Sequence, residues 1–207
     1  MDKVIMITGA SSDLGMAYIR ENYTQYDKIL AHYHHESEAF EEVCKMCGDK
    51  ICRMQADLSQ PEEVTKLIQQ WKQTQLVPTH ILHLASCAPK SVRFHKADIT
   101  EYENMMQVGL YSIVEVLKAC LPGMQKQKYG RIVFLLSAYV KIDDPKYAAP
   151  YVTAKYALLG LMKDLAAEYA AKGITVNGIS PQMIETKFLK DVPELIVEQQ
   201  RTAGPLQ

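Results

Sequence analysis

The chain has 207 residues, of which 48% are hydrophobic and 23% charged, and its formal net charge is −1. This composition is typical of a folded globular protein and excludes a disordered chain, a collagen and a coiled coil. A near-neutral charge gives no electrostatic reason to expect nucleic acid or an anionic membrane as a partner. No apolar run approaches the ~18 residues of a membrane span, and the first residues show no secretory-signal pattern. The five cysteines indicate reduced thiols, so we expect a cytoplasmic protein.

Short apolar runs alternate with helical patterns along most of the chain. Strands are expected at residues 4–7, 28–32, 50–55, 80–84, 131–136 and 174–179. Helices are expected near residues 14–23, 36–47, 61–73, 99–120 and 151–172. Strands that are apolar on both faces and alternate with helices are typical of a parallel sheet covered on both sides. We therefore predict a single α/β domain over residues 1–207, with a doubly wound parallel sheet that binds its ligand at the carboxyl ends of the strands.

The tail follows a different pattern. After residue 179 there is a loop and a weak helical pattern near residues 192–200, with no further strand. The strand at 174–179 is therefore expected at an open edge of the sheet.

A glycine-containing turn follows the first predicted strand, in the order Thr8-Gly9-Ala10-Ser11-Ser12-Asp13-Leu14-Gly15. Glycine permits a sharp turn and a close approach to a pyrophosphate, and a helix N-terminus attracts phosphate. Ser11 and Ser12 can cap the helix or bind phosphate oxygens. Asp13 is unexpected here, because a carboxylate repels phosphate unless it caps the helix and directs its charge away. On these residues alone, a plain strand-to-helix turn is the alternative.

A tyrosine and a lysine, Tyr151 and Lys155, are four residues apart on a predicted helix and so share one face. An ammonium near a phenol lowers the pKa of the phenol from ~10, which allows proton exchange with an alcohol or ketone near neutral pH. Such pairs also occur on ordinary helix surfaces. Ser137 favours a site, because it ends a buried strand and can hydrogen-bond the same substrate oxygen.

Together these residues resemble the short-chain dehydrogenase/reductase family, and within it the bacterial 3-oxoacyl-[acyl-carrier-protein] reductases. The resemblance covers essentially residues 3–190. The matching motifs are the turn at 8–15, Asp57-Leu58, the strand at 130–133 leading to Ser137, the pair Tyr151 and Lys155, the strand at 173–177, and Pro181 with residues 184–186.

The resemblance implies reduction of a carbonyl, in a 3-oxoacyl thioester, by hydride transfer from NADPH. It implies that Tyr151 is the general acid, that Lys155 lowers the pKa of Tyr151 and holds the nicotinamide ribose, and that Ser137 orients the carbonyl. The implied cofactor contacts are Gly9, Ser11, Ser12, Asp13, Leu14, Gly15, His34, Asp57, Leu58, Ala85, Tyr151, Lys155, Pro181, Ile184 and Thr186.

Cofactor choice is expected at the end of the second strand, in the run Ala31-His32-Tyr33-His34-His35-Glu36. NAD-binding members place an acidic residue there, whereas many NADP-binding members place a basic one. A protonated His34 can accept a 2′-phosphate, so we expect NADP, with NAD as the alternative. A polar strand end is the other interpretation of the three histidines. A metal site is not expected, because no matching ligands follow at zinc spacing.

Four departures from the family pattern stand out. His83-Leu84-Ala85-Ser86 replaces Asn-Asn-Ala-Gly, Gly109 replaces the asparagine that holds a water near the lysine, and Gln182 replaces a glycine. The chain also stops where the family continues with a substrate-covering helix and a last strand. We expect a slower proton relay from Gly109.

The departures leave two alternatives open: a dinucleotide-binding protein with little catalysis, and a fragment that needs its C-terminal segment. The helices near 99–120 and 151–172 are those through which the family often assembles, so we expect a homodimer rather than a tetramer. The expected partners are a small-molecule or acyl-carrier thioester, without nucleic acid or membrane. Cys44 and Cys47 form a CxxC that is expected to be a pair of ordinary thiols on a surface helix.

Overall fold

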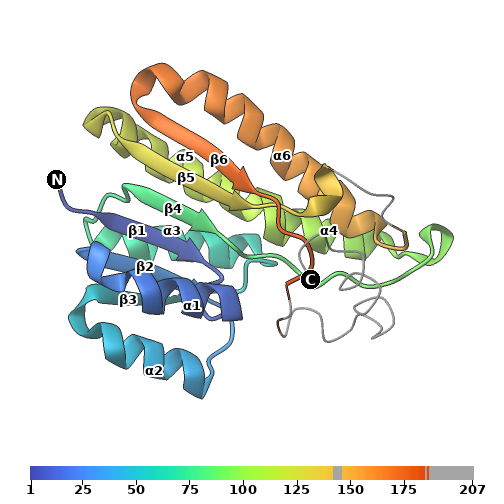
Figure 1. Cartoon of the computed structure of the whole chain (residues 1–207), viewed down its shortest axis with the longest axis horizontal. Coiled ribbons are helices and arrows are strands. Elements are labelled where there is room, and N and C mark those ends of the chain that lie inside the picture. Colours follow the sequence, from blue (N-terminus) through green and yellow to red (C-terminus); the bar gives the residue numbers. More distant parts are fainter. Residues whose placement is uncertain (142–145, 185, 187–207) are drawn as a thin grey trace.

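The computed structural model describes residues 1–141, 146–184 and 186. Six parallel strands form one sheet in the order β3-β2-β1-β4-β5-β6 (Figure 1). The strands are β1 (Val4–Thr8), β2 (Lys28–Tyr33), β3 (Ile51–Gln55), β4 (His80–His83), β5 (Gly130–Leu135) and β6 (Ile174–Ile179). The helices are α1 (Asp13–Asn22), α2 (Glu38–Cys47), α3 (Pro61–Gln73), α4 (Ile99–Met106), α5 (Ser112–Gln127) and α6 (Ala149–Tyr169). This confirms the predicted α/β fold with a parallel, Rossmann-like sheet.

The helix predicted at 99–120 differs most from the structure. It continues to Gln127, and a π-helical turn, Gln107–Tyr111, separates α4 from α5. Gly109 lies inside this turn, and Pro122 lies within α5. Wide turns of this kind are frequent at functional sites. The helical pattern near 192–200 lies outside the described residues.

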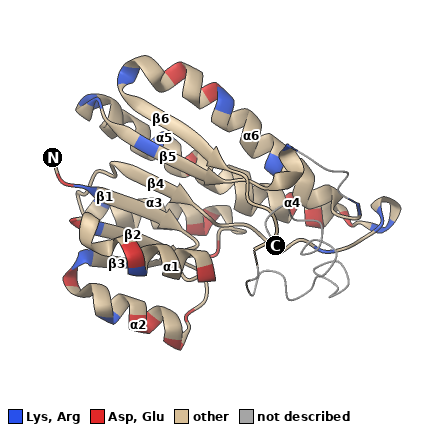
Figure 2. Ribbon diagram, viewed as in Figure 1, with Lys and Arg blue, Asp and Glu red and all other residues tan. Residues whose placement is uncertain are grey.

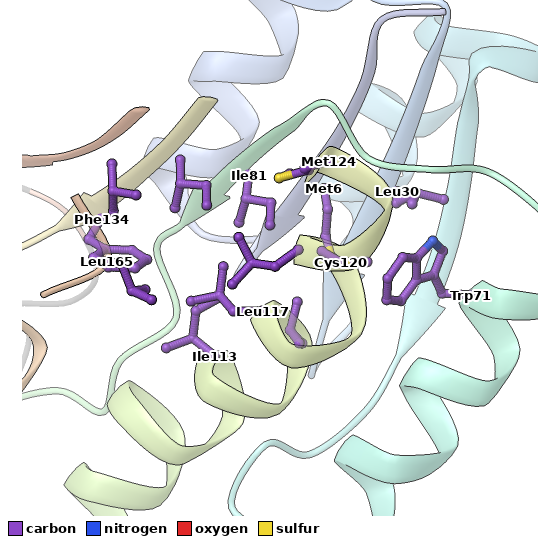
Figure 3. Packing of buried hydrophobic residues seen from close by; sticks show 14 of the residues in the cluster. Met6, Leu30, Trp71, Ile81, Ile113, Leu117, Cys120, Met124, Phe134 and Leu165 are labelled. Atoms are coloured by element: carbon purple, nitrogen blue, oxygen red, sulfur yellow. The ribbon is translucent and has the colours of Figure 1, made fainter. Parts of the chain in front are cut away.

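The helices divide between the two faces of the sheet as right-handed crossovers require. α1 and α2 pack on one face, where Phe40 and Ile19 belong to a buried cluster with β1 and β2. α3, α5 and α6 pack on the other face. Figure 3 shows this second face, with Leu117 of α5 near Ile81 of β4 and Trp71 of α3 near Leu30 of β2.

The face of β6 that lies opposite α6 is open among the described residues. Ile174 and Val176 are buried, whereas Thr175 and Asn177 are exposed and Ile179 is 56% exposed. In Figure 1 no described helix covers the near face of β5 and β6. β6 is also the last strand of the described sheet, as the sequence predicted.

One continuous helix, Ile99–Gln127, is long and apolar enough by length and composition to cross a membrane. Its apolar residues pack on the sheet instead: Ile113, Leu117 and Met124 are each at most 2% exposed and belong to the core cluster. The burial of this face accounts for the hydropathy of the helix.

The two cysteines of the CxxC, predicted to be ordinary thiols on a surface helix, are free thiols that lie on the buried face of α2. Cys44 and Cys47 are 7% and 5% exposed and face the sheet within α2. Burial raises the pKa of both thiols, that of Cys44 to about 11, so both remain protonated and unreactive at neutral pH. All five cysteines lie in the described residues and are free thiols.

Candidate active site

A cavity of about 410 Å³ lies at the carboxyl ends of the strands, where the strand order reverses between β1 and β4. Ten of the predicted site residues line it: Ser11, Ser12, Asp13, Leu14, Ser137, Tyr151, Lys155, Pro181, Ile184 and Thr186. The fold therefore gathers the turn after β1, the end of β5, the start of α6 and the segment after β6 around one space.

The turn after β1 requires both of its glycines. Gly9 has a φ of +74°, and a Cβ there would lie 3.1 Å from the backbone nitrogen of Ala85. A Cβ on Gly15 would lie 2.6 Å from the carbonyl oxygens of Gly9 and Ala10. Ser12 caps α1, because its Oγ accepts a hydrogen bond from the Gly15 N–H at 3.1 Å. The N-terminus of α1 is thereby placed at the cavity, in an arrangement suited to a phosphate group.

Six predicted cofactor residues, Gly9, Gly15, His34, Asp57, Leu58 and Ala85, do not line the cavity. The two glycines shape the turn, and Ala85 closes against Gly9. Leu58 is 4% exposed and packs in the core. Their cofactor roles stay predictions.

The three histidines after β2 have different surroundings. His32 is 3% exposed, and its Nδ1 accepts a hydrogen bond from the Gly9 N–H at 3.1 Å. Its Nε2 therefore carries the proton and donates to the carbonyl of Ala56 at 3.0 Å. Burial lowers the pKa of His32 to about 4, which keeps the ring neutral. His32 thus supports the turn after β1 rather than the ligand.

His34 does not line the cavity, but His35 and Glu36 do. The Nε2 of His34 is 3.8 Å from Oδ2 of Asp57, and its ring stacks on His35 with centroids 3.7 Å apart. Burial acts to raise the pKa of Asp57, but hydrogen bonding to Ser59 and the charge of His34 outweigh it, so the pKa is lowered. The His34 position is therefore next to a carboxylate, and the His35 ring is the one that reaches the cavity.

Glu36, which lines the cavity beside His35, takes part in an ion pair. Glu36 pairs with Arg53 of β3, whose guanidinium lies 5.4 Å from the centre of the Tyr33 ring. Just after β2, the glutamate thus pairs with an arginine and follows two stacked histidines in sequence.

Tyr151 and Lys155 lie on the first turns of α6, where they are 9% and 5% exposed. Lys155 Nζ donates a hydrogen bond of 2.8 Å to the carbonyl of Leu135 and lies 5.5 Å from the centre of the Tyr151 ring. Ser137 follows β5 and accepts a hydrogen bond of 3.3 Å from the Tyr139 N–H. The Tyr139 and Tyr151 rings meet edge to face with centroids 6.5 Å apart.

The expected lowering of the Tyr151 pKa is not found in this state. Burial raises the pKa of Tyr151, and a hydrogen bond with Ser137 only partly offsets the increase. Lys155 is itself buried, which lowers its own pKa to about 8. The ammonium is directed at the Leu135 carbonyl, so the phenol remains protonated at neutral pH.

Sequence reasoning did not find the hydrogen bonds of His83, which stands in place of the first asparagine of the family's Asn-Asn-Ala-Gly. His83 is 1% exposed at the end of β4. Its Nδ1 is 2.6 Å from Thr8 Oγ1, and its Nε2 is 3.0 Å from the carbonyl oxygen of Gly109. A carbonyl only accepts, so Nε2 donates to Gly109 and Nδ1 accepts from Thr8. One neutral imidazole therefore ties β1, β4 and the π-helical turn together.

Gly109 has open space where a side chain would be. A Cβ there would meet nothing within 4 Å. The turn makes its contribution through its backbone carbonyl, and it contacts α6, which carries Tyr151 and Lys155. The described residues contain no group of histidine, cysteine and acidic side chains that could hold a metal ion.

The sequence is similar to curated proteins over nearly its whole length. It is 26% identical to D-beta-hydroxybutyrate dehydrogenase from Rhizobium meliloti, over 99% of this chain and 79% of that protein. It is 27% identical to the 3-oxoacyl-[acyl-carrier-protein] reductase FabG of Haemophilus influenzae, over 96% of this chain and 79% of that protein.

The fold is also that of known structures. The structure of ElxO with NADP bound matches with a TM-score of 0.81 at 22% identity, over 96% of this chain and 80% of that chain. Residues 3–195 match the short chain dehydrogenase family. The chain therefore belongs to the short-chain dehydrogenase family of oxidoreductases.

Proposed function

We propose that this protein uses NADPH to reduce the carbonyl of a 3-oxoacyl thioester to an alcohol. The observation that carries the proposal is the placement of Ser137, Tyr151 and Lys155 in one cavity with the turn after β1. The cavity thus offers a proton donor, a second hydrogen-bonding group and a cation beside a cradle for a dinucleotide.

The residues of the cradle fit a dinucleotide. The turn after Gly9 and the N-terminus of α1 reach the cavity through Ser11, Ser12 and Asp13, in a position suited to a pyrophosphate. The residues that would hold the rest of the cofactor are His35 and Glu36 at the adenosine end, and Lys155 and Thr186 at the nicotinamide end. NADPH, when bound, supplies the hydride that reduces the carbonyl carbon.

The proton comes from this chain's own residues. Ser137 and Tyr151 hydrogen-bond the carbonyl oxygen, and Tyr151 donates its phenolic proton to that oxygen as the carbon accepts the hydride. Burial raises the pKa of Tyr151, which keeps the proton on the phenol before the hydride transfer. Once the proton has left, the Lys155 ammonium near the ring stabilises the phenolate.

We infer the substrate class from two of the proteins to which the chain is similar. A D-beta-hydroxybutyrate dehydrogenase and a 3-oxoacyl-[acyl-carrier-protein] reductase both act on an acyl chain with its oxygen at the third carbon. We place the present chain with them, as a single cytoplasmic domain that forms a homodimer and takes a small-molecule or carrier-bound thioester.

NADP rather than NAD is supported by Arg53 of β3 and by the histidines that follow β2. Arg53 neutralises Glu36, which would otherwise repel a 2′-phosphate, and the His34–His35 stack lies beside it. The similarity to a structure with NADP bound also favours NADP.

The test is oxidation of NADPH, and separately of NADH, in the presence of acetoacetyl thioesters. We expect turnover that prefers NADPH and falls at least a hundredfold in Tyr151→Phe, because one proton donor contributes about 10²–10⁴-fold. NADPH binding, measured by fluorescence, should be unchanged in that variant. Tight NADPH binding without turnover on any carbonyl would instead support a binding protein.

A further inference from the structure

The loop between β4 and α4 is strongly cationic. Residues 88–97 contain Lys90, Arg93 and Lys96 and no acidic residue, and Asp98 follows as the N-cap of α4. Figure 2 shows this loop extending from the body of the molecule with its lysine and arginine residues in blue. Lys90 pairs with Glu101 at 3.3 Å, but no salt bridge within the described part of the chain engages Arg93 or Lys96. The outer part of the loop therefore presents uncompensated positive charge.

An aromatic side chain stands among these cations. Phe94 is 77% exposed and begins a short 3₁₀ turn, Phe94–Lys96. A phenyl ring that is left in water adds little to the stability of the fold. Exposed rings flanked by cations suit a nucleotide, because a base stacks on the ring while the cations bind its phosphates. The surface thus has the chemistry of a nucleotide-binding patch.

This loop is joined to the candidate active site. The Val92 N–H donates a hydrogen bond of 2.8 Å to the carbonyl of Tyr147. Lys90 and Ser91 on one side, and Tyr147 on the other, line the same cavity as Tyr151. A substrate whose carbonyl lies at Tyr151 would therefore pass Lys90 and Ser91, and Arg93 and Phe94 follow these two residues in the same loop.

We propose that Arg93, Phe94 and Lys96 bind the 3′-phosphorylated adenosine diphosphate head of a coenzyme A thioester, whose acyl group lies at Tyr151. The proposal rests on the proposed function and names the carrier of its substrate. The cations complement the phosphates of this head, and the exposed ring provides a stacking platform for its adenine. An acyl-carrier protein offers a phosphate but no adenine, so Phe94 favours coenzyme A.

The experiment compares two substrates that share one reacting acyl group. Acetoacetyl-coenzyme A carries the nucleotide, and the neutral acetoacetyl-N-acetylcysteamine thioester does not. Arg93→Ala/Lys96→Ala should lower kcat/KM for the coenzyme A thioester about tenfold, mainly through KM, since two phosphate contacts are lost. Phe94→Ser should lower it about fivefold through lost stacking. Neither variant should change kcat/KM for the neutral thioester.

The control is Arg20→Ala/Lys66→Ala, which removes the same two charge types from exposed positions on α1 and α3. It should leave both substrates unaffected. Unchanged kcat/KM for the coenzyme A thioester in the Arg93 and Lys96 variant would overturn the proposal. An equal loss on both substrates would also overturn it.

A second readout separates this proposal from the proposed function. With NADPH saturating the dinucleotide site, calorimetry should detect adenosine 3′,5′-bisphosphate binding to the wild type and the control, and at least tenfold weaker binding to Arg93→Ala/Lys96→Ala. Such binding without any thioester turnover would defeat the proposed function and keep the nucleotide patch. Turnover of both thioesters without nucleotide binding would defeat the nucleotide patch and keep the proposed function.

Discussion

His83 acts on the site without lining its cavity. Its ring links Thr8 to Gly109, and the π-helical turn that contains Gly109 contacts α6. The Ala85 N–H donates to Thr8 Oγ1 at 3.4 Å, which leaves the hydroxyl proton for His83 Nδ1. The family's asparagine is missing at position 109, and a histidine from β4 bonds to the backbone carbonyl there.

Replacing His83 should therefore be more harmful than filling the space at Gly109. His83→Leu leaves the Gly109 carbonyl buried without its donor and should lower the free energy of unfolding by about 2–3 kcal/mol. Turnover should fall with it, as the turn against α6 loosens. Gly109→Ala should be tolerated, because its Cβ meets open space and alanine favours a helix by about 1 kcal/mol. Urea unfolding of both variants checks this, and a His83→Leu protein as stable as the wild type would contradict it.

At the residue scale, the sequence predicted which side chains meet but not how they bond. Ser137, Tyr151 and Lys155 were expected at one site and line one cavity. The hydrogen bond from Lys155 to the Leu135 carbonyl depends on how α6 packs over β5, which no local pattern encodes. The same holds for His83, whose two partners are 75 and 26 residues away.

At the scale of the elements, the start of α1 is the most constrained junction. A Cβ at Gly15 would lie 2.6 Å from two backbone carbonyl oxygens, and backbone atoms in a sheet-to-helix turn have little freedom to move. The strands were predicted to within a residue, because buried parallel strands are short apolar runs. The π-helical turn was not predicted, because an extra residue in a helix leaves no clear mark on the hydrophobic pattern.

A matched pair of glycine substitutions tests the constraint at α1. Gly15→Ala should lower the free energy of unfolding by about 2 kcal/mol through overpacking and weaken NADPH binding. Gly160→Ala, at an exposed position of α6 where a Cβ meets nothing within 4 Å, should raise it by about 1 kcal/mol. Thermal unfolding and NADPH titration of the two proteins give the comparison. Equal stability changes of the same sign would show that the turn can accommodate a Cβ at Gly15.

At the scale of the whole molecule, two buried neutral histidines make stability depend on pH. Burial lowers the pKa of His32 to about 4 and that of His83 to about 3, against about 6.5 in the unfolded chain. Below pH 6.5 the unfolded state therefore binds protons that the folded state does not. The stability from these two groups is fully present above pH 6.5 and is lost as the pH falls toward 4 and 3.

We expect the free energy of unfolding to fall between pH 6 and 4 by about 1.4 kcal/mol per pH unit for each of the two histidines. His83→Asn removes one titrating group and keeps an amide donor. It should therefore reduce the slope of the unfolding free energy against pH by about 1.4 kcal/mol per pH unit. Urea unfolding at a series of pH values measures it. A slope in His83→Asn equal to that of the wild type would show that His83 is not buried in its neutral form.

The whole-molecule architecture was the part best predicted from the sequence, since the alternation of strands and helices and the order of motifs along the chain both point to one fold. The open edge at β6 was expected from the absence of a further strand pattern, and β6 is the last strand of the described sheet. The cationic loop at residues 88–97 was not expected to matter for the site. In sequence it is an ordinary polar loop, and only the fold places its first residues, Lys90 and Ser91, at the cavity.

The most direct test of the central claim follows a deuterium atom. NADPH deuterated at the nicotinamide C4 is supplied with acetoacetyl-N-acetylcysteamine thioester, and mass spectrometry measures the product. We predict a 3-hydroxy product that carries one deuterium at the third carbon with the wild type, and no product with Tyr151→Phe, although that variant still binds NADPH. Absence of the label from the wild-type product, or labelled product from Tyr151→Phe at the wild-type rate, would contradict the assignment.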